Sequence, residues 1–572
     1  MGMSLKNLEI IRVDDIPVLL AMISEMNIQH EIDRHIHPHG LWQGISVGTI
    51  VTIWLCYILT EQDHRLEPVQ EWVNQRQRLF NELLGIQLRD TDMSDDRLAN
   101  VLTMLGTDTV QSVIDQALNQ HWITLYELPT EIKRFDSTTI AVYQDIKEDE
   151  DSIIGHGYSK DHRPDLAQFK VMLSTLDMGL PLTCQVVNGK RADDGLYIPA
   201  YDSVIETTGH TRFLAVGDSK MAAKETRSHI SQNGSWYLCP YRGTAAKGEN
   251  IAGWIEAAIQ KYDQLEEVKV VNEETGELSR LATVDEWSRW QTLSSATGEE
   301  IRWLERVVVA HSPSYQQGML TRRLRHANQL DEALERLRQP PGRGRKRYKT
   351  KAELDETVAN LMRKHRMEGL VTIEVLEETC ADGGIRWIVG RWKRNQQAWD
   401  EMTKRLGWQI YVTSLPQEAY PTAEVIHIYR RQPHLERSIS RLKSRTLHIR
   451  PIFLHKEERI IGLTWILVLA LRFIVLMEFR VRRELVVRKE VLYGLKASSP
   501  NSGTTKPTTE KMLEAFSNIS WTIITLDEET THYHVTPLSD TQIHILKLLN
   551  LSSDIYERLS LANPKPLVNL LE

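Results

Sequence analysis

The chain has 572 residues, of which 41% are hydrophobic and 26% are charged. This composition excludes a collagen-like, wholly disordered or disulfide-framework protein, and at about 150 residues per domain the length predicts roughly four folded units. The formal charge is −8, so any affinity for nucleic acid has to come from local basic patches. The four cysteines are far apart and form no Cys-x-x-Cys pair, which fits a reducing cytosol.

Two features of the sequence bear on export and membranes. The N-terminus lacks a basic start followed by an apolar run, so the sequence predicts no secretory signal. The most apolar run, residues 460–471, is closed by Arg472 and is shorter than the roughly 20 residues needed to cross a bilayer. We therefore expect a buried core helix there and no membrane partner.

Residues 1–128 are interpreted as an all-helical N-terminal domain. Apolar residues recur at helical spacing, and no strand pattern interrupts them. Ser94 precedes one segment like an N-cap, and acids follow it in the first turn, where the helix dipole favours them. The expected helices span residues 16–26, 46–60, 66–84 and 95–105.

Residues 129–243 are interpreted as the first part of a mixed α/β core. A strand at 131–142 rich in β-branched residues is followed by a hairpin with strands at 169–176 and 182–188. The expected order then is a helix at 192–207, a strand at 212–216, a helix at 221–231 and a strand at 236–239. Strands followed by alternating helices and strands indicate a mixed sheet layered by helices.

The rest of the chain is divided into three parts, which makes the protein multidomain α/β. Residues 244–407 read as an irregular insertion domain, residues 408–480 as the second part of the core, and residues 481–572 as a small C-terminal region. The expected elements are strands at 304–310, 384–389, 408–413 and 521–526, helices at 317–337, 422–445 and 540–551, and a linker at 496–509.

Three acids occupy places where the expected elements hold side chains rigidly. Asp136 lies in the first strand of the core, and Asp218 follows a later strand at its carboxyl end, where open sheets place their ligand sites. Glu436 lies in the late helix, seven residues after Tyr429 and seven before Lys443. Seven residues return within about 20° of the same helical face, so these three side chains are expected to share one stripe.

This pattern resembles the DDE transposases of bacterial insertion sequences, which belong to the ribonuclease H-like superfamily. The order of strand Asp, strand-end Asp and helix Glu is the family's order, and the late helix matches its Tyr, Arg, Glu, Lys signature except at Gln432, where the family has Arg. Neighbouring Arg430 and Arg431 can replace that contact to DNA phosphate. Residues 157–166, 217–222 and 450–460 look like the group typified by insertion sequence sixteen thirty-four. The resemblance implies a ribonuclease H-like mixed sheet interrupted by a large insertion.

Pro433 conflicts with one continuous late helix. A proline inside a helix removes a backbone donor and costs roughly 3 kcal/mol or more. Either the helix kinks near Tyr429, or a new helix starts with Pro433 at its first position. In the second case Glu436 and Lys443 stay on one face, and Tyr429 need not share it.

The resemblance implies a catalytic and metal-binding set of Asp136, Asp218 and Glu436. Two Mg²⁺ ions, for which Mn²⁺ can substitute, stabilise the attacking and leaving oxygens of an in-line phosphoryl transfer, and such ions prefer carboxylate oxygen. Asp136 would bridge both ions, with Asp218 and Glu436 each completing one side. Taken singly, each acid also fits a turn, cap or surface ion pair. The rival ligands are Asp161, Asp165, Asp193 and Asp194.

Two basic segments stand out on a chain that is acidic overall. Residues 336–351 carry eight bases and no acid, and residues 430–450 carry seven bases against Glu436. Such patches indicate contact with the phosphate backbone, although a solvated face or a flexible loop gives the same pattern. The expected DNA-binding residues are Tyr429, Arg430, Arg431, Gln432, Lys443, Lys220, Arg343, Arg345, Lys346 and Arg347. Trp287, Trp290 and Trp303 could stack an unpaired base, but core packing is the preferred interpretation.

The resemblance implies an enzyme that cleaves and strand-transfers the ends of its own insertion sequence, with the helical N-terminal domain of residues 1–128 binding DNA. Expected partners are double-stranded DNA, as terminal inverted repeats and as target, and a second copy of the chain, because two element ends have to be held together. A bacterial cytoplasmic, nucleoid-associated location is expected. The alternatives are a metal-dependent nuclease without strand transfer and a DNA-binding regulator that has lost catalysis.

Overall fold

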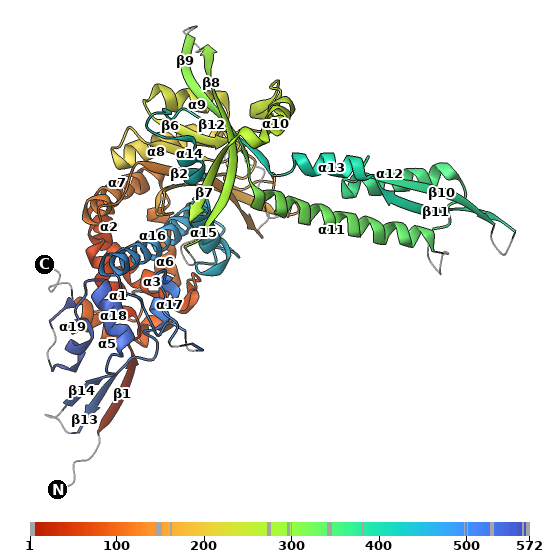
Figure 1. Cartoon of the computed structure of the whole chain (residues 1–572). Coiled ribbons are helices and arrows are strands. Elements are labelled where there is room, and N and C mark those ends of the chain that lie inside the picture. Colours follow the sequence, from red (N-terminus) through yellow and green to blue (C-terminus); the bar gives the residue numbers. More distant parts are fainter. Residues whose placement is uncertain are drawn as a thin grey trace. The chain divides into compact units, whose positions relative to one another are not determined.

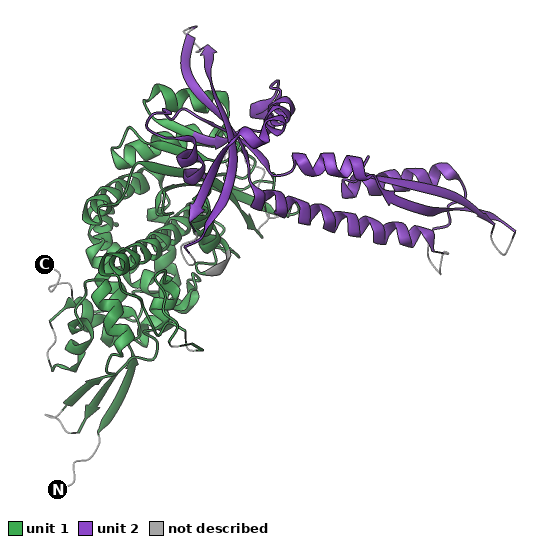
Figure 2. Ribbon diagram, in the orientation of Figure 1, with its two compact units in different colours: residues 1–237, 430–572 green, residues 238–429 purple. Residues whose placement is uncertain are grey.

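The computed structural model describes most of the chain, and within it two compact units (Figures 1 and 2). The described residues are 6–143, 152–160, 163–271, 276–294, 298, 300–339, 346–379, 383–496, 498–499, 501–526, 531–562 and 565–567, without the side chains of 444 and 445. Unit 1 contains residues 1–237 and 430–572, and unit 2 contains residues 238–429. Each unit is described by itself, and the five-part division of the sequence stays a prediction.

Unit 1 begins with one strand and seven helices. These are β1 (Asn7–Arg12), α1 (Ile16–Glu25), α2 (Ile28–His35), α3 (Val47–Glu61), α4 (Glu67–Asn74), α5 (Gln77–Leu84), α6 (Asp95–Leu105) and α7 (Asp108–Leu125). The expected helices are confirmed, with the segment at 66–84 split into α4 and α5. The all-helical prediction is wrong at β1, which pairs antiparallel with β13 (Ser520–Thr525) near the other end of the chain. A strand formed by so distant a partner leaves no local pattern.

Helix α16 (Glu457–Arg488) lies at the centre of unit 1, packed against α3, α6 and β4 (Pro181–Asn188) (Figure 1). At Gly462 a Cβ would lie 2.2 Å from the Leu102 carbonyl oxygen, so the close crossing of α16 and α6 requires glycine. Of the described helices, α16 is the one long and apolar enough to cross a membrane, and 94% of its most apolar stretch is buried inside the protein. The expected core helix at 460–471 is therefore confirmed as part of a longer buried helix.

The sheet of unit 1 has the strand order β4-β3-β2-β5-β6. Its strands are β2 (Ile132–Val142), β3 (Ala167–Leu176), β4, β5 (Leu214–Gly217) and β6 (Trp236–Pro240), whose last three residues belong to unit 2. Strands β2, β3 and β4 form antiparallel pairs, whereas β5 runs parallel to β2. The connecting elements are the 3₁₀ turn η1 (Asp194–Leu196) and helices α8 (Tyr197–Thr208) and α9 (Lys224–Gln232). The predicted mixed sheet with alternating helices is confirmed.

Lys133 on β2 gives a test of this packing. Its side chain is fully buried, its Nζ donates to Thr208 Oγ1 over 2.9 Å, and burial lowers its pKa to about 7. Between pH 7 and 10.5 the unfolded chain therefore binds more protons than the folded chain, so the free energy of unfolding rises with pH in that window. Below pH 7 Lys133 is charged in both states, and the full cost of burying its charge lowers the stability. We expect Lys133→Met to stabilise the protein by about 1–3 kcal/mol at pH 6 and by less at pH 9. Urea unfolding at the two pH values measures this, and an equal gain at both would contradict it.

Unit 2 continues the strand order as β6-β12-β9-β8-β7. The strands are β7 (Glu266–Val271), β8 (Leu278–Ser294), β9 (Glu300–His311) and β12 (Trp408–Thr413), and the helical elements are η2 (Gly243–Ala246), α10 (Ile251–Gln260), η3 (Tyr262–Gln264) and α14 (Thr422–Arg430). The predicted strands at 304–310 and 408–413 are confirmed, and all the pairs that join β12, β9, β8 and β7 are antiparallel.

A separate hydrophobic cluster lies within unit 2. It joins α11 (Pro313–Arg338), α12 (Lys351–His365), the hairpin of β10 (Val371–Thr379) and β11 (Ile385–Arg394), and α13 (Gln396–Arg405) (Figure 1). Leu330, Leu334 and Leu354 are fully buried in it. The insertion is therefore regular rather than irregular, because helices and strands of low apolar content share one small core.

The C-terminal part of unit 1 combines short helices and strands. They are α15 (Pro433–Ser440), the π-helical turn η4 (Arg441–Arg445), α17 (Thr509–Glu514), β13, β14 (Thr531–Val535), α18 (Asp540–Leu548), α19 (Asp554–Glu557) and η5 (Arg558–Ser560). Ser539 and Gln542 form a capping box at the start of α18, which lies within the helix predicted at 540–551.

Candidate active site

Two of the three acids lie at matching levels of neighbouring strands, Asp136 within β2 and Asp218 directly after β5. In the parallel pair of β2 and β5, Phe135 lies opposite Gly217, and the next residues are Asp136 and Asp218. Neighbouring strands are about 4.8 Å apart, so this register brings the two aspartates to one edge. A Cβ at Gly217 would lie 3.0 Å from the ring of Tyr197, so glycine lets that ring approach.

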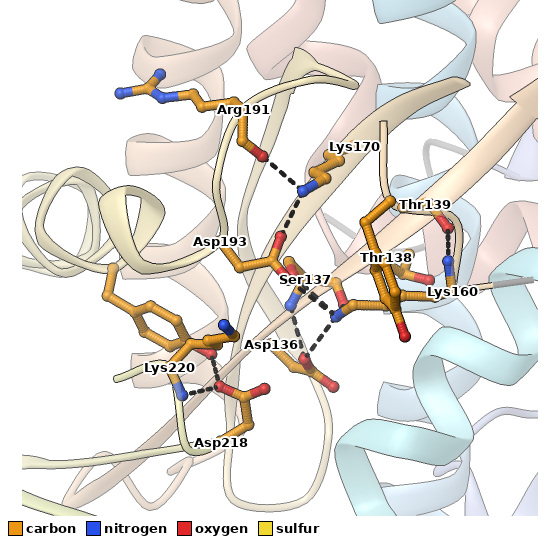
Figure 3. Close-up of polar contacts among 12 residues, drawn as sticks. Asp136, Ser137, Thr138, Thr139, Lys160, Lys170, Arg191, Asp193, Asp218 and Lys220 are labelled. Carbon is orange, nitrogen blue, oxygen red and sulfur yellow. Dashed lines mark hydrogen bonds and ion pairs between the residues drawn. The ribbon is translucent and has the colours of Figure 1, made fainter. Parts of the chain in front are cut away.

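Asp218 is oriented by two donors that meet the same oxygen. The Tyr197 hydroxyl donates to Oδ1 over 2.6 Å. The Lys220 backbone N–H donates to the same oxygen over 2.8 Å (Figure 3). Burial, together with the charges of Asp218 and Asp136, raises the pKa of Tyr197 well above its usual value, so the hydroxyl stays a donor. No described hydrogen bond reaches Oδ2, which leaves that oxygen available to a metal ion.

The contact from Tyr197 predicts a measurable effect. We expect Tyr197→Phe to lower the rate of metal-dependent DNA cleavage or the metal affinity by about 10- to 100-fold, because partners that orient a metal ligand have effects of this size. Tyr201→Phe is the matched control, since Tyr201 is also buried on α8 and has no described contact with the acids. Equal cleavage rates of the two variants would exclude the orienting role.

The charges of both other acids act on the carboxylate of Asp136. The pKa of Asp136 is raised to about 6, mainly by burial and also by the charges of Asp218 and Glu436, whereas Lys160 and the Ser137 backbone N–H lower it. The N–H donates to Asp136 Oδ1 over 2.8 Å, and Lys160 Nζ lies 3.6 Å from that oxygen (Figure 3). Carboxylates far apart in the sequence therefore interact at one place in unit 1.

Glu436 reaches this place from a helix that starts at the proline. Helix α14 ends at Arg430 and α15 begins at Pro433, so the prediction of one helix at 422–445 is wrong and the alternative of a new helix at Pro433 is confirmed. Ser438 is buried and its hydroxyl donates to the Gly179 carbonyl oxygen over 2.8 Å, and α15 also lies against β2. Glu436 is exposed in the first turn of α15, where the helix dipole favours a carboxylate.

The three carboxylates fit divalent ions in donor chemistry. Hard ions such as Mg²⁺ prefer carboxylate oxygen, and the mutual repulsion seen at Asp136 is relieved when a cation binds. Within the described residues, however, no group of three or more His, Cys, Asp or Glu side chains is gathered closely enough to hold one ion. A site with two ions shares its carboxylates between them, so it does not require all three on one ion.

Lys443 contacts the strand that carries Asp136. Its Nζ donates to Thr138 Oγ1 over 3.2 Å, and Thr138 lies two residues after Asp136 on the same face of β2. Lys220 adjoins Asp218 through its backbone, and its side chain is exposed. Both lysines can therefore reach a phosphate beside the carboxylates.

The remaining residues of the late helices have other contacts. Gln432 is buried, and its side-chain oxygen accepts a hydrogen bond from Arg134 over 3.0 Å, so its described partner is internal. Arg431 pairs with Asp177 over 3.0 Å and is 41% exposed, and Arg430 is half-buried. Tyr429 belongs to unit 2, where its ring lies 4.6 Å from that of Tyr411. Their contact with DNA stays a prediction.

The basic loop of the insertion is described only in part. Lys346 lies over the ring of Tyr348 at 5.1 Å, Arg347 is half-buried, and Arg343 and Arg345 lie outside the described residues. Among the tryptophans, Trp303 is buried, Trp287 contacts Trp254, and Trp290 is 58% exposed under Arg302. None of these contacts places the insertion at the carboxylates.

Three of the four rival acids have other roles or partners, and the fourth is not described. Asp193 Oδ1 pairs with Lys170 over 2.7 Å, and exposed Asp165 pairs with Arg163 over 2.7 Å. Asp194 begins η1, and Asp161 lies outside the described residues.

Sequence reasoning missed Tyr197 and Lys160. Lys160 lies inside the segment 157–166 that carried the resemblance, but no spacing rule connects it to Asp136. Tyr197 is one of 17 tyrosines, and its role follows only from the approach of α8 to the end of β5.

Comparison with known proteins identifies the family. The model of the transposase DDE domain matches residues 129–473, more than half of the chain and a span that contains all three acids. The chain therefore belongs to the DDE transposase family, whose members generally use divalent metal ions. No curated protein matches the chain. Among solved structures, the cryo-EM structure of the piggyBac transposase synaptic complex with hairpin DNA is similar at a TM-score of 0.33 and 7% identity, covering 87% of this chain and 79% of that chain. A likeness this weak carries no argument.

Proposed function

We propose that this transposase cleaves the ends of its own insertion sequence and joins them to target DNA by two-metal-ion phosphoryl transfer. The observation that carries the proposal is geometric: the register of β2 and β5 places Asp136 beside Asp218, and helix α15, which carries Glu436, packs on β2. All three acids lie within the matched transposase domain. The motifs at residues 157–166, 217–222 and 450–460 support placement in the branch typified by insertion sequence sixteen thirty-four.

The residues of the site have separate roles in this proposal. Asp136, Asp218 and Glu436 would hold the Mg²⁺ ions, for which Mn²⁺ could substitute; Asp136 would serve both ions, and Asp218 and Glu436 would each serve one. When bound, the ions supply charge stabilisation for the attacking and leaving oxygens of the phosphodiester. Tyr197 keeps Asp218 in one orientation through the bond to Oδ1, and Lys443 holds the DNA backbone beside Asp136 through its position at Thr138.

The proposed partners follow from the reaction. Double-stranded DNA is bound as the terminal inverted repeats of the element and as the target. A homodimer in the bacterial cytoplasm, at the nucleoid, would hold two ends together. The genomic flank gives an independent check, because inverted repeats bordering the coding region with short direct duplications outside them are the expected product of such an enzyme.

A strand-transfer assay tests the proposal. The purified chain is given a pre-cut end of its flanking DNA with a 3′ hydroxyl, a target plasmid and Mg²⁺, and joined product is expected. Cleavage of uncut ends without joined product would support the nuclease alternative. Binding without any Mg²⁺-dependent cleavage would support the silent regulator.

A further inference from the structure

The ammonium of Lys160 lies beside the carboxylate at the centre of the site. Lys160 is in the connection between β2 and β3, and its backbone N–H donates to Thr139 Oγ1 over 3.2 Å. Its Nζ donates to the Ser137 carbonyl oxygen over 2.5 Å and to Ser137 Oγ over 3.0 Å, and lies 3.6 Å from Asp136 Oδ1 (Figure 3). Strand β2 therefore holds the Lys160 ammonium beside Asp136, which lies on the same strand.

Comparison with Lys170 shows which of the two ammonium groups near Asp193 is held in place and which can move. Lys170 is 4% exposed and is fixed by Asp193 over 2.7 Å and by the Arg191 carbonyl oxygen over 2.5 Å. Lys160 lies 3.8 Å from the other oxygen of Asp193, and its side chain is 30% exposed. Lys170 is thus part of the packed interior, whereas the flexible stem of Lys160 can carry its ammonium out to solvent.

A divalent ion and this ammonium compete for the same place. Burial raises the pKa of Asp136, and among the opposing influences the positive charge of Lys160 comes first, so this lysine already neutralises the carboxylate. A metal ion on Asp136 would bring a second positive charge to within a few ångströms of Lys160. In a partly buried site such repulsion is screened much less than in water.

We propose that Lys160 is the built-in counter-ion of the carboxylate site, occupying Asp136 in the metal-free protein until a divalent ion displaces it. The inference rests on the proposed function, because it takes these carboxylates to be metal ligands. The exchange keeps the acids neutralised both before and after metal binding. A residue outside the ligand set therefore regulates how tightly the site binds its metal.

Binding of Mn²⁺ to the full chain without DNA tests this exchange. Calorimetry and electron paramagnetic resonance compare the wild type with Lys160→Met and Lys160→Gln, and each variant is expected to bind Mn²⁺ roughly tenfold more tightly. Lys160→Arg keeps the charge and should stay near the wild-type affinity. Lys190→Met is the matched control, since this exposed lysine follows β4 and has no described contact with Asp136. Without metal, Lys160→Met should also unfold at a lower temperature than the wild type, and Mn²⁺ should remove the difference.

Three results separate failure of this inference from failure of the proposed function. If Asp136→Asn abolishes Mn²⁺ binding while both neutral Lys160 variants bind no more tightly than the wild type, the counter-ion role is overturned and the metal site stands. A loss of DNA cleavage in those variants at unchanged Mn²⁺ affinity also overturns the counter-ion role, because it would place the ammonium on DNA. If Asp136→Asn binds Mn²⁺ as the wild type does, the metal site itself is overturned, and the counter-ion role with it.

Discussion

Asp136→Asn, Asp218→Asn and Glu436→Gln are each expected to slow Mg²⁺-dependent DNA cleavage by about 10³-fold or more. Each substitution keeps the size and one acceptor oxygen of the side chain but removes the charge that holds a divalent ion. The loss should be similar for all three, because side chains that share two ions act as a unit. Cleavage of the flanking DNA under single-turnover conditions, at saturating Mg²⁺, measures the effect.

The controls for this prediction distinguish chemistry from folding and from DNA binding. Affinity for DNA, measured in Ca²⁺ to prevent cleavage, should stay close to the wild-type value. Asp165→Asn is the matched variant, because Asp165 is an exposed acid of the same unit that pairs with Arg163 rather than with the three carboxylates. A variant of Glu436 that cleaves normally would remove it from the site and leave only the pair on β2 and β5.

The pair of aspartates is the part of the site that sequence reasoning could reach. β-branched and apolar runs predicted β2 and β5, and the rule that ligands bind at strand ends singled out Asp218, whereas Asp136, which lies within β2, was added by the family resemblance. Local pattern does not give the register, however. That Phe135 lies opposite Gly217 is decided by the packing of the whole sheet, and it is this register that brings the two acids side by side.

Glu436 shows the limit of spacing arguments. The seven-residue intervals to Tyr429 and Lys443 assumed one regular helix, but Pro433 starts a new helix and a π-helical turn follows it at Arg441–Arg445. What keeps Glu436 near Asp136 is the packing of α15 on β2 and the bond of Ser438 to Gly179. The proline could be read from the sequence, but the tertiary contacts that compensate for it could not.

Contacts between segments that are distant in the sequence could not be predicted either, because they depend on tertiary packing. Strand β1 exists because β13 supplies its hydrogen bonds, and Tyr197 and Lys160 act through side-chain contacts that depend on how α8 and the β2–β3 connection fold back. None of these leaves a period or a spacing in the sequence. The type of an element was therefore predictable where its burial is periodic, whereas the roles of Tyr197 and Lys160 were not.

Arg472→Met is expected to destabilise the protein by about 3–5 kcal/mol, the cost of leaving one partner of a buried ion pair alone. Arg472 ended the apolar run in the sequence, yet it is fully buried in α16. Its guanidinium pairs with Asp115 over 2.5 Å and donates to the carbonyl oxygens of Pro181 and Leu182 over 3.1 and 2.8 Å. One side chain thus links α16 to α7 and to β4 of the sheet that carries the acids.

The thermal unfolding midpoint of the full chain measures this loss, and a paired variant tests its cause. In Arg472→Met, Asp115 stays 4% exposed and keeps only its bond from Trp465 Nε1 among the described donors, so a buried charge remains without its cation. Replacing Asp115 by Leu in the same chain removes that charge and should recover much of the stability, since an apolar pair of similar volume often matches a buried ion pair. Arg488→Met, which breaks a partly exposed pair with Glu484 on the same helix, should change stability by less than about 1 kcal/mol. If Arg472→Met unfolds at the same temperature as Arg488→Met, Arg472 does not hold α16 to α7 and β4, and these elements are held together by apolar packing alone.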